Sequence, residues 1–262
     1  MKTAFSWQSF RRGAAGFAFL LVVWEAFARS GLFTQAITPP LTGIVQAGWH
    51  MLLDGTLPKN AMFTLGRVLL GLFFACLAGI PIGMLMGRLH VVERFCLPLI
   101  SVLMPIPSLA WVPLFILWFG IGEVTTILVV IYAATFPVIY NVWTGVRAIN
   151  PLWARAAIAM GAGQRQLFRN VVLPGALPYV LTGVRLAFGR AWIAVIGGEL
   201  LANPVWGLGR VIFDAKEFLN SEVMMASLVA IGVIGLTFER IIFQAVETAT
   251  VARWGMVVGA KR

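Results

Sequence analysis

Long apolar segments constrain this 262-residue sequence more than any other feature. A helix needs about 20 mostly apolar residues in succession to cross a bilayer. Six segments qualify, and they cover residues 14–32, 65–86, 97–119, 124–143, 177–201 and 223–246. With 60% hydrophobic and 11% charged residues, the composition excludes an ordinary soluble domain. We therefore expect an all-α polytopic membrane protein with about six transmembrane helices, forming a single domain over residues 1–262.

The net charge of +10 is distributed unevenly between the connectors. With a cytoplasmic amino terminus, the cytoplasmic side carries Lys2, Arg11, Arg12, Arg88, Arg94, Arg147, Arg155, Arg165, Arg169, Arg253, Lys261 and Arg262. The other side carries Lys59, Arg210 and Lys216 among Asp54, Glu123, Asp214, Glu217 and Glu222. This bias follows the positive-inside rule, so both termini are predicted to be cytoplasmic. The basic excess indicates topology and not nucleic-acid binding.

A polar, arginine-bearing connector at residues 150–175 is typical of a docking element. Asn150 can cap a first short helix, and Pro151 suits its first turn. Gly161 and Gly163 predict a turn, after which residues 164–172 can form a second helix. Small alanine side chains would let another protein approach the first helix closely. Pro174 and Pro178 then mark the return into the next apolar segment.

The same connector resembles the "EAA" cytoplasmic loop of permease subunits in bacterial ATP-binding-cassette importers. The matching residues are Ala156, Ala157, Gly161 and Ala162, followed by Leu167, Phe168 and the run from Val172 to Pro178. The resemblance continues at residues 105–123 and 198–209, and it is nearest to the taurine, alkanesulfonate and nitrate branch. One position departs from the pattern, because Arg155 stands where the motif has glutamate.

This resemblance implies a bacterial inner-membrane permease with the fold of a type I importer. It implies a second permease copy, cytoplasmic ATP-binding subunits and an extracytoplasmic solute-binding protein as partners. ATP and Mg²⁺ would be bound by the ATP-binding subunits, and no cofactor by this chain. The docking residues it implies are Arg155, Ala156, Ala157, Gly161, Ala162, Leu167 and Phe168, within a loop of about residues 147–175.

Prolines interrupt the third apolar segment, where Pro98, Pro105, Pro107 and Pro113 follow one another closely. Each proline removes a backbone hydrogen bond, and non-helical backbone at membrane depth needs protein or a water-filled cavity around it. Broken helices often line transport pathways. The candidate lining residues are Ser101, Met104, Ser108 and Trp111. The alternative is a kinked helix that serves packing alone.

Charged residues inside apolar segments face a bundle, a cavity or the interface, because burial in lipid costs about 3 kcal/mol. Arg190 and Glu199 share the fifth segment but lie about 13 Å apart along a helix, too far for a direct pair. Arg190 could attract an anionic substrate. The alternative is a structural pair with Glu25 or with Glu199 of a neighbouring element, and Arg67 has the same ambiguity.

The small residues Ala75, Gly79, Gly83 and Gly87 recur every four positions and predict close helix contact, within the chain or between two copies. Thr42 is expected to cap an interfacial helix before Asp54. His50 and His90 fall on opposite sides of the membrane, and no phosphate-binding Gly-Lys-Ser/Thr motif is present, so we expect neither a metal site nor an enzyme. The main alternative is a secondary transporter or channel that works without ATP.

Overall fold

The computed structural model describes residues 7–34 and 36–243, which contain helices and no strands. The elements are α1 (Trp7–Arg29), α2 (Leu41–Leu53), α3 (Thr56–Arg88), α4 (His90–Leu103), η1 (Ser108–Trp111), α5 (Val112–Phe119), α6 (Glu123–Arg147), α7 (Pro151–Ala159), α8 (Gln164–Leu167), η2 (Phe168–Val172), α9 (Leu173–Ala202), α10 (Leu208–Glu217), α11 (Ser221–Thr237) and η3 (Phe238–Phe243). The predicted all-α class is confirmed.

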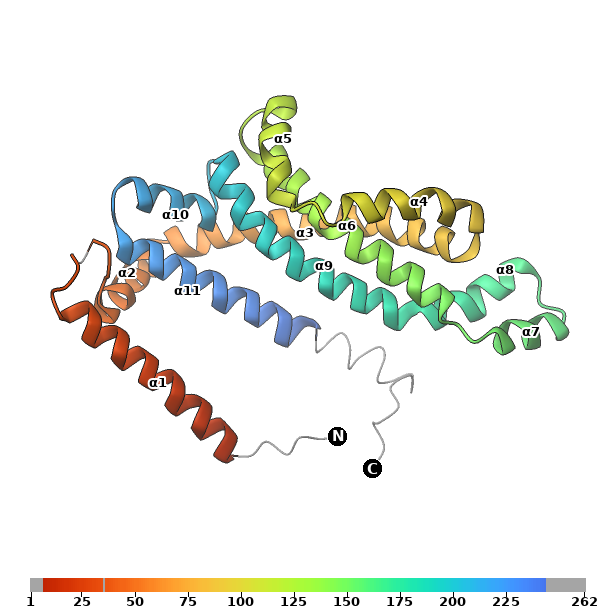
Figure 1. Cartoon of the computed structure of the whole chain (residues 1–262), viewed down its shortest axis with the longest axis horizontal. Coiled ribbons are helices and arrows are strands. Elements are labelled where there is room, and N and C mark those ends of the chain that lie inside the picture. Colours follow the sequence, from red (N-terminus) through yellow and green to blue (C-terminus); the bar gives the residue numbers. More distant parts are fainter. Residues whose placement is uncertain (1–6, 35, 244–262) are drawn as a thin grey trace.

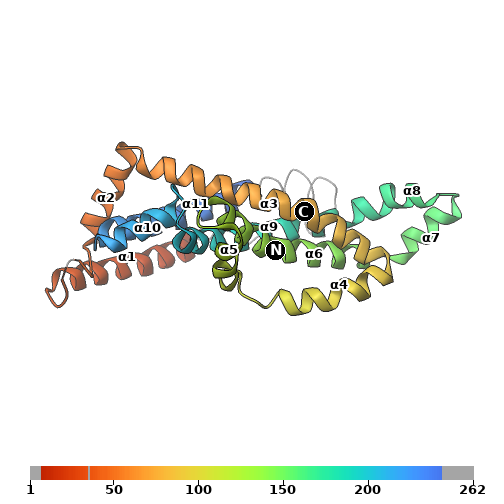
Figure 2. The same cartoon turned by 90° about the horizontal axis from the view of Figure 1, so that it is seen from above.

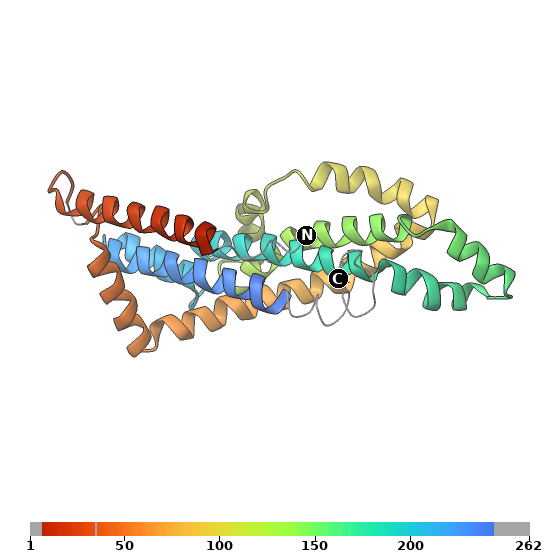
Figure 3. The ribbon, with the colours of Figure 1, turned by 90° about the horizontal axis from the view of Figure 1, so that it is seen from below.

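Three long helices, α3, α6 and α9, form the centre of an elongated molecule (Figure 1). Helix α6 packs along both of the others, and the largest buried cluster joins the three. At one end α7 and α8 project beyond the bundle, whereas α2 and α10 lie at the other end (Figure 2). Helix α1 contacts α2 and diverges from the central helices, as Figure 1 shows, although they overlap in the view of Figure 3.

Four helical segments are long and apolar enough to cross a membrane: Thr56–Arg88, Glu123–Arg147, Gln164–Ala202 and Ser221–Ile241. The predicted span 97–119 is not one straight helix, because α4 and the η1–α5 arm meet at 88°. Counted as one broken span, this pair makes five. Helix α1, predicted as the first span, is helical but is not among these candidates in the described residues. Residues 244–246 of the predicted last span lie outside the described residues.

The small residues of α3 face α6 of the same chain. A Cβ atom added to Gly79 would lie 2.9 Å from Val138 Cγ1, and one added to Gly87 would lie 2.5 Å from Val146 Cβ. At Gly83 the neighbours are Val142 Cβ at 2.7 Å and the backbone oxygen of Ile139 at 2.8 Å. The stripe therefore lets two helix backbones approach closely within the chain, as van der Waals packing in lipid requires.

We expect Gly83→Ala to destabilise the bundle, because the added methyl group meets α6 backbone that cannot rotate away. Overpacking of this kind costs about 1–3 kcal/mol. Gly66→Ala on the same helix is the matched control, since a Cβ there meets nothing within 4 Å. Thermal unfolding of the purified permease should show a lower melting temperature for Gly83→Ala only. Equal melting temperatures for both variants would contradict this packing argument.

Helix α2 begins differently from the prediction. Its N-cap is Pro40 and not Thr42, and the side-chain acceptor comes from another helix. Glu25 Oε2 accepts a hydrogen bond from the Leu41 N–H at 2.6 Å, while Glu25 Oε1 accepts from Arg29 Nε at 2.6 Å. Glu25 therefore joins α1 to α2, and the suggested pair between Glu25 and Arg190 is wrong.

Candidate functional site

The break between α4 and η1 borders a cavity of about 380 Å³ at the middle of the bundle. It lies between the broken segment, α6 and α9. Its lining residues are Met104, Pro105, Ile106, Pro107, Ser108, Leu109, Tyr132, Ala133, Phe136, Pro137, Arg190, Ile193 and Ala194. Volumes of about 300–1,000 Å³ are usual for small-molecule sites. The prolines therefore mark a hollow and not merely a kinked packing helix.

The predicted pathway residues divide into three groups. Met104, Ser108 and Arg190 come together at this cavity although 82 residues separate Ser108 from Arg190 in sequence. Ser101 is exposed on α4 and donates to the Leu97 carbonyl at 2.8 Å. Trp111 does not line the cavity, and its ring lies 5.2 Å from the Tyr132 ring. Glu199 belongs to a separate buried cluster.

The broken segment is fixed against α6 and α9. The Tyr132 hydroxyl donates to the Leu103 carbonyl at 2.6 Å, at the last residue of α4. The Leu109 side chain packs against α9 at Gly197. It occupies the space of a side chain there, since a Cβ atom added to Gly197 would lie 2.3 Å from Leu109 Cδ2. These two contacts hold the non-helical backbone in place on both sides of the cavity.

Charge at the cavity comes from Arg190 alone among the lining residues. Arg190 is exposed, and none of the ion pairs in residues 7–34 and 36–243 includes it. The predicted alternative, a structural pair of Arg190 with Glu199, is not formed. An unpaired guanidinium can bind a carboxylate or a similar planar anion through two parallel hydrogen bonds.

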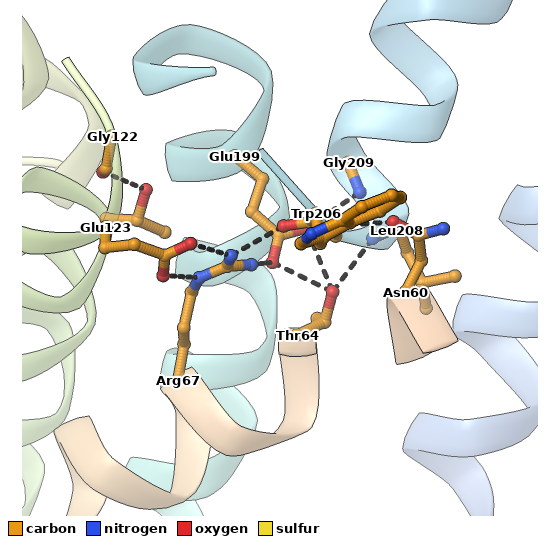
Figure 4. Close-up of polar contacts among 11 residues, drawn as sticks. Asn60, Thr64, Arg67, Gly122, Glu123, Glu199, Trp206, Leu208 and Gly209 are labelled. Carbon is orange, nitrogen blue, oxygen red and sulfur yellow. Dashed lines mark hydrogen bonds and ion pairs between the residues drawn. The ribbon is translucent and has the colours of Figure 1, made fainter. Parts of the chain in front are cut away.

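Glu199 lies instead in a buried polar cluster at the end opposite α7 and α8 (Figure 4). Arg67 Nη1 donates to Glu199 Oε1 at 2.5 Å. From the other edge of the guanidinium, Nε and Nη2 donate to Glu123 Oε2 and Oε1 at 2.6 and 2.5 Å. The Thr64 hydroxyl donates to both Glu199 oxygens at 2.8 and 3.0 Å. One arginine thereby joins α3, α6 and α9.

The same cluster fixes the turn from α9 to α10. The N–H of Gly209 donates to Glu199 Oε2 at 2.8 Å, and the N–H of Gly207 donates to Asn60 Oδ1 at 2.7 Å. Gly207 has φ +149°, and a Cβ there would lie 2.5 Å from the Glu199 carboxyl carbon. Only glycine fits this position. Glu199 is therefore fully buried and satisfied, as a structural charge in this environment must be.

The sequence held a signal for this cluster that the prediction left unused. Asn60, Thr64 and Arg67 are spaced by four and three residues, so they form one polar stripe on an apolar helix. Tyr132 and Phe136, which line the cavity from α6, were also not among the predicted residues. Their spacing of four places both aromatic rings on one helix face.

The predicted docking connector folds as one short helix, α7, followed by a glycine turn, whereas its predicted second short helix is the beginning of a long helical segment. Asn150 Oδ1 accepts from the Leu152 N–H at 2.9 Å and caps α7, as expected. Gly161 has φ +83°, and the next residue's N–H donates to the Ala157 carbonyl at 3.0 Å. Pro174 and Pro178 do not interrupt the helix, because α8, η2 and α9 form one helical segment, Gln164–Ala202.

The motif residues differ in exposure. Arg155, Ala156 and Gly161 are exposed, Ala162 and Leu167 are half-buried, and Ala157 is buried. Phe168 packs against the core cluster, and the Arg88 guanidinium lies 5.0 Å from its ring centre. Arg88 also donates to Gln164 Oε1 at 3.2 Å. Phe168 thus anchors the connector to α3 from within.

A second contact at this end joins α4 to α6. Glu93, which is buried, binds Arg147, and its Oε2 atom lies 3.2 Å from His90 Nδ1.

The connector also has exposed apolar side chains on α7 and the following turn, namely those of Leu152, Trp153, Ile158 and Met160. Residues 147–175 contain four arginines and no acidic residue. The connector therefore offers an apolar, positively charged surface.

Comparison with known proteins agrees with this architecture. Residues 79–249 match the family described as "Binding-protein-dependent transport system inner membrane component". The taurine transport system permease protein TauC of Escherichia coli is 37% identical over 227 residues, covering 85% of this chain and 82% of that protein. The bicarbonate transport system permease protein CmpB of Synechococcus elongatus is 30% identical, covering 87% and 85%. The nitrate import permease protein NrtB of Leptolyngbya laminosa is also 30% identical, covering 87% and 84%.

Solved structures agree in fold. The MetNI methionine ABC transporter in inward-facing conformations aligns with a TM-score of 0.62 at 22% identity, covering 72% of this chain and 93% of that chain. An amino acid ABC transporter aligns with a TM-score of 0.60 at 17% identity, covering 76% and 96%. The chain therefore belongs to the family of binding-protein-dependent transport system inner membrane components and is a permease subunit of an ABC importer.

Proposed function

We propose that this permease carries a small anionic solute across the inner membrane, through a pathway that includes the cavity beside the α4–η1 break. The observation that carries this proposal is Arg190 on the long helix α9, a cation that lines the cavity and belongs to none of the ion pairs within residues 7–34 and 36–243. A charge at this depth is unfavourable unless it faces water, a partner or a ligand. Taurine, bicarbonate and nitrate, for which relatives are named, each carry an anionic group.

Within this proposal residues 1–262 act as one permease domain, and the connector of about residues 147–175 receives a cytoplasmic ATP-binding subunit. The contact surface comprises Arg155, Ala156, Gly161, Ala162 and Leu167, while Ala157 is buried beneath it and Phe168 holds it to the bundle. ATP and Mg²⁺ are bound by those subunits and not by this chain. Because the connector has arginines without acids, the receiving surface is expected to be acidic at its rim.

The orientation follows from the same charges. Arg88, Arg94, Arg155, Arg165 and Arg169 lie toward the end that carries α7 and α8, so this end is assigned to the cytoplasm, with both termini. The opposite end, with α2 and α10, faces the solute-binding protein. A second copy of the chain completes the pathway, and lipid surrounds the exposed apolar faces.

The proposed coupling is direct. The segment Gln164–Ala202 carries the connector at its beginning and Arg190 farther along the same helical path. When the two ATP-binding subunits close, movement of α8 is transmitted through η2 into α9 and changes the cavity. No flexible loop intervenes to absorb the movement.

Purification of the tagged chain from its native membrane in mild detergent tests the assembly. An ATP-binding subunit in near-equal amount, together with solute uptake by vesicles that depends on internal ATP, is the expected result. A chain that purifies alone and transports solute in ATP-free vesicles would support the alternative, a secondary transporter.

Arg190→Gln is expected to lower ATP-driven uptake at least tenfold, because the cavity loses the one cation among its described lining residues. Arg190→Lys should keep part of the uptake, since lysine retains the charge but not the planar two-donor geometry. Arg210→Gln on α10 is the control; its pair with Asp214 is partly exposed and outside the cavity. Unchanged uptake by Arg190→Gln, at normal membrane levels, would contradict the proposed pathway.

A further inference from the structure

A groove of about 290 Å³ lies between α3 and α6 beside the buried Arg67 cluster. Met62, Phe63 and Leu70 of α3 line it with exposed apolar side chains, and Ile127 adds apolar surface from α6. Gly66 keeps the groove open, because a Cβ atom added there would meet nothing within 4 Å. The groove shares no lining residue with the cavity at the helix break, so it is a separate feature of the surface.

The polar edge of this groove carries more negative than positive charge. Glu123 and Glu199 each form an ion pair with Arg67 and with no other cation in residues 7–34 and 36–243. Two carboxylates therefore share one guanidinium, and one negative charge is not compensated. Glu199 is fully buried, whereas the Glu123 side chain is 47% exposed and lines the groove. A cationic group that enters the groove would be attracted to Glu123.

The spacing of charges along α3 places Arg67 at the edge of the hydrocarbon layer. Residues 68–87 include no charged residue, and Arg88 follows them at the end near the connector. These 20 residues span about 30 Å, which is the thickness of the hydrocarbon core. Residues 124–146 of α6, which follow Glu123, are also uncharged. Arg67 and Glu123 therefore lie at the depth of lipid head groups.

We propose that the groove binds one phospholipid of the surrounding bilayer, with a primary ammonium head group on Glu123 and an acyl chain against Leu70 and Ile127. The head group supplies the missing positive charge at the depth where lipid head groups lie. The two apolar residues follow Glu123 and Arg67 into the hydrocarbon layer, where acyl chains lie. This inference goes beyond solute transport and does not depend on the proposed pathway.

The chemistry at Glu123 favours ethanolamine over other common head groups. Each Glu123 oxygen accepts one hydrogen bond from Arg67 and has a further lone pair for an N–H donor. A primary ammonium can donate there, whereas choline has no N–H and phosphatidylglycerol has no cation. The Phe63 ring is stacked on Trp206 with 6.4 Å between the ring centroids, so this wall of the groove is preformed.

The test measures lipid binding to the purified, delipidated permease complex by native mass spectrometry. Phosphatidylethanolamine, phosphatidylcholine and phosphatidylglycerol with the same acyl chains are titrated separately. Phosphatidylethanolamine is expected to bind about fivefold more tightly than phosphatidylglycerol, which is the ratio that a partly exposed ion pair produces. Phosphatidylcholine should fall between them, because it has the charge but no donor.

Three variants separate the groove from its charge. Gly66→Leu fills the groove without touching the Arg67 cluster, and it should remove one bound phosphatidylethanolamine per chain. Gly232→Leu on α11 is the matched control and should keep that lipid, because a Cβ there also meets nothing within 4 Å. Glu123→Gln leaves an acceptor for Arg67 but removes the charge, so the three lipids should bind alike. If Glu123→Gln protein is unstable, the comparison of the two leucine variants decides.

Three results would overturn the site. The first is equal affinity of the parent protein for phosphatidylethanolamine and phosphatidylglycerol. The second is an unchanged number of bound lipids in Gly66→Leu. The third is crosslinking of Gly66→Cys to the same position of a second copy in native membranes, with Cys76 and Cys96 replaced by alanine. That result would show that the groove is an interface between two copies.

Discussion

Replacing Glu199 with alanine is expected to remove most of the folded permease from the membrane. The variant leaves Arg67, which is 3% exposed, with half of its counter-charge, and it leaves the Thr64 hydroxyl and the Gly209 N–H without their acceptor. Removing one partner of a buried ion pair destabilises a protein by about 3–5 kcal/mol. That is a large share of the total stability of a typical domain, which is about 5–15 kcal/mol. The measurement is the yield and melting temperature of monodisperse protein.

Two controls give this result its meaning. Glu217→Ala removes an exposed glutamate whose pair with Lys216 is solvated, so its effect should stay below about 1 kcal/mol. Arg67→Met combined with Glu199→Met removes both buried charges and should recover part of the yield, because Glu123, the carboxylate that loses its arginine, is 47% exposed and stays solvated. In a domain of this size, a loss of about 1 kcal/mol lowers the melting temperature by at least about 2 °C. A Glu199→Ala protein that melts within about 2 °C of the parent would therefore show that the cluster does not stabilise the fold.

Gly161→Asp is expected to abolish ATP-driven uptake, by about a hundredfold or more, while the protein still inserts and folds. Gly161 turns the chain between α7 and α8 with φ +83°, and a side chain there would meet nothing within 4 Å of this chain. Aspartate tolerates this backbone conformation better than most residues. The change therefore acts on what the connector contacts, by placing a bulky negative group on the proposed docking surface. Uptake and co-purification of the ATP-binding subunit are measured together.

Gly31 provides a matched control for this variant. It has φ +74° and open space around its Cβ position, but it follows α1 far from the connector. Gly31→Asp should transport normally, which separates backbone strain from loss of docking. Gly161→Asn tests the charge, and it should retain more uptake than Gly161→Asp. Normal uptake and normal co-purification by Gly161→Asp would remove the docking assignment.

The fold was largely predictable because its main determinants are local. Apolar runs, the cap at Asn150 and the glycine stripe of α3 each depend on residues close in sequence. The cap and the close helix contact form as predicted, and the apolar runs are helical, although the run 97–119 forms two helices and not one. The break at Pro105 and Pro107 was also predictable, since proline removes a backbone donor. Its 88° angle was not, because the angle depends on Leu109 packing against Gly197 on a helix nearly 90 residues later.

The site was predictable only in part, for the same reason. Proline chemistry suggested four lining residues, of which Met104 and Ser108 border the cavity and Ser101 and Trp111 do not, and Arg190 reaches the same cavity from α9. The partner of Glu199 was left open, because Arg67 lies 132 residues away and sequence spacing says nothing about which helices meet. Phe168 shows the same limit. The motif identifies the residue, but its contact with Arg88 depends on tertiary packing that the motif does not predict.

The helical segment from Gln164 to Ala202 joins the connector directly to Arg190, so a rotation at one end moves the other. Its 39 residues follow a helical path of about 58 Å at 1.5 Å per residue, and about 39 Å of that path separates the connector end from Arg190. A tilt of about 5° at the connector would displace that guanidinium by about 3 Å, which is the length of one hydrogen bond. The stroke needed to release a bound anion is therefore small. Under the docking proposed above, a small rotation of this segment by an ATP-binding subunit is therefore enough to release an anion held by Arg190.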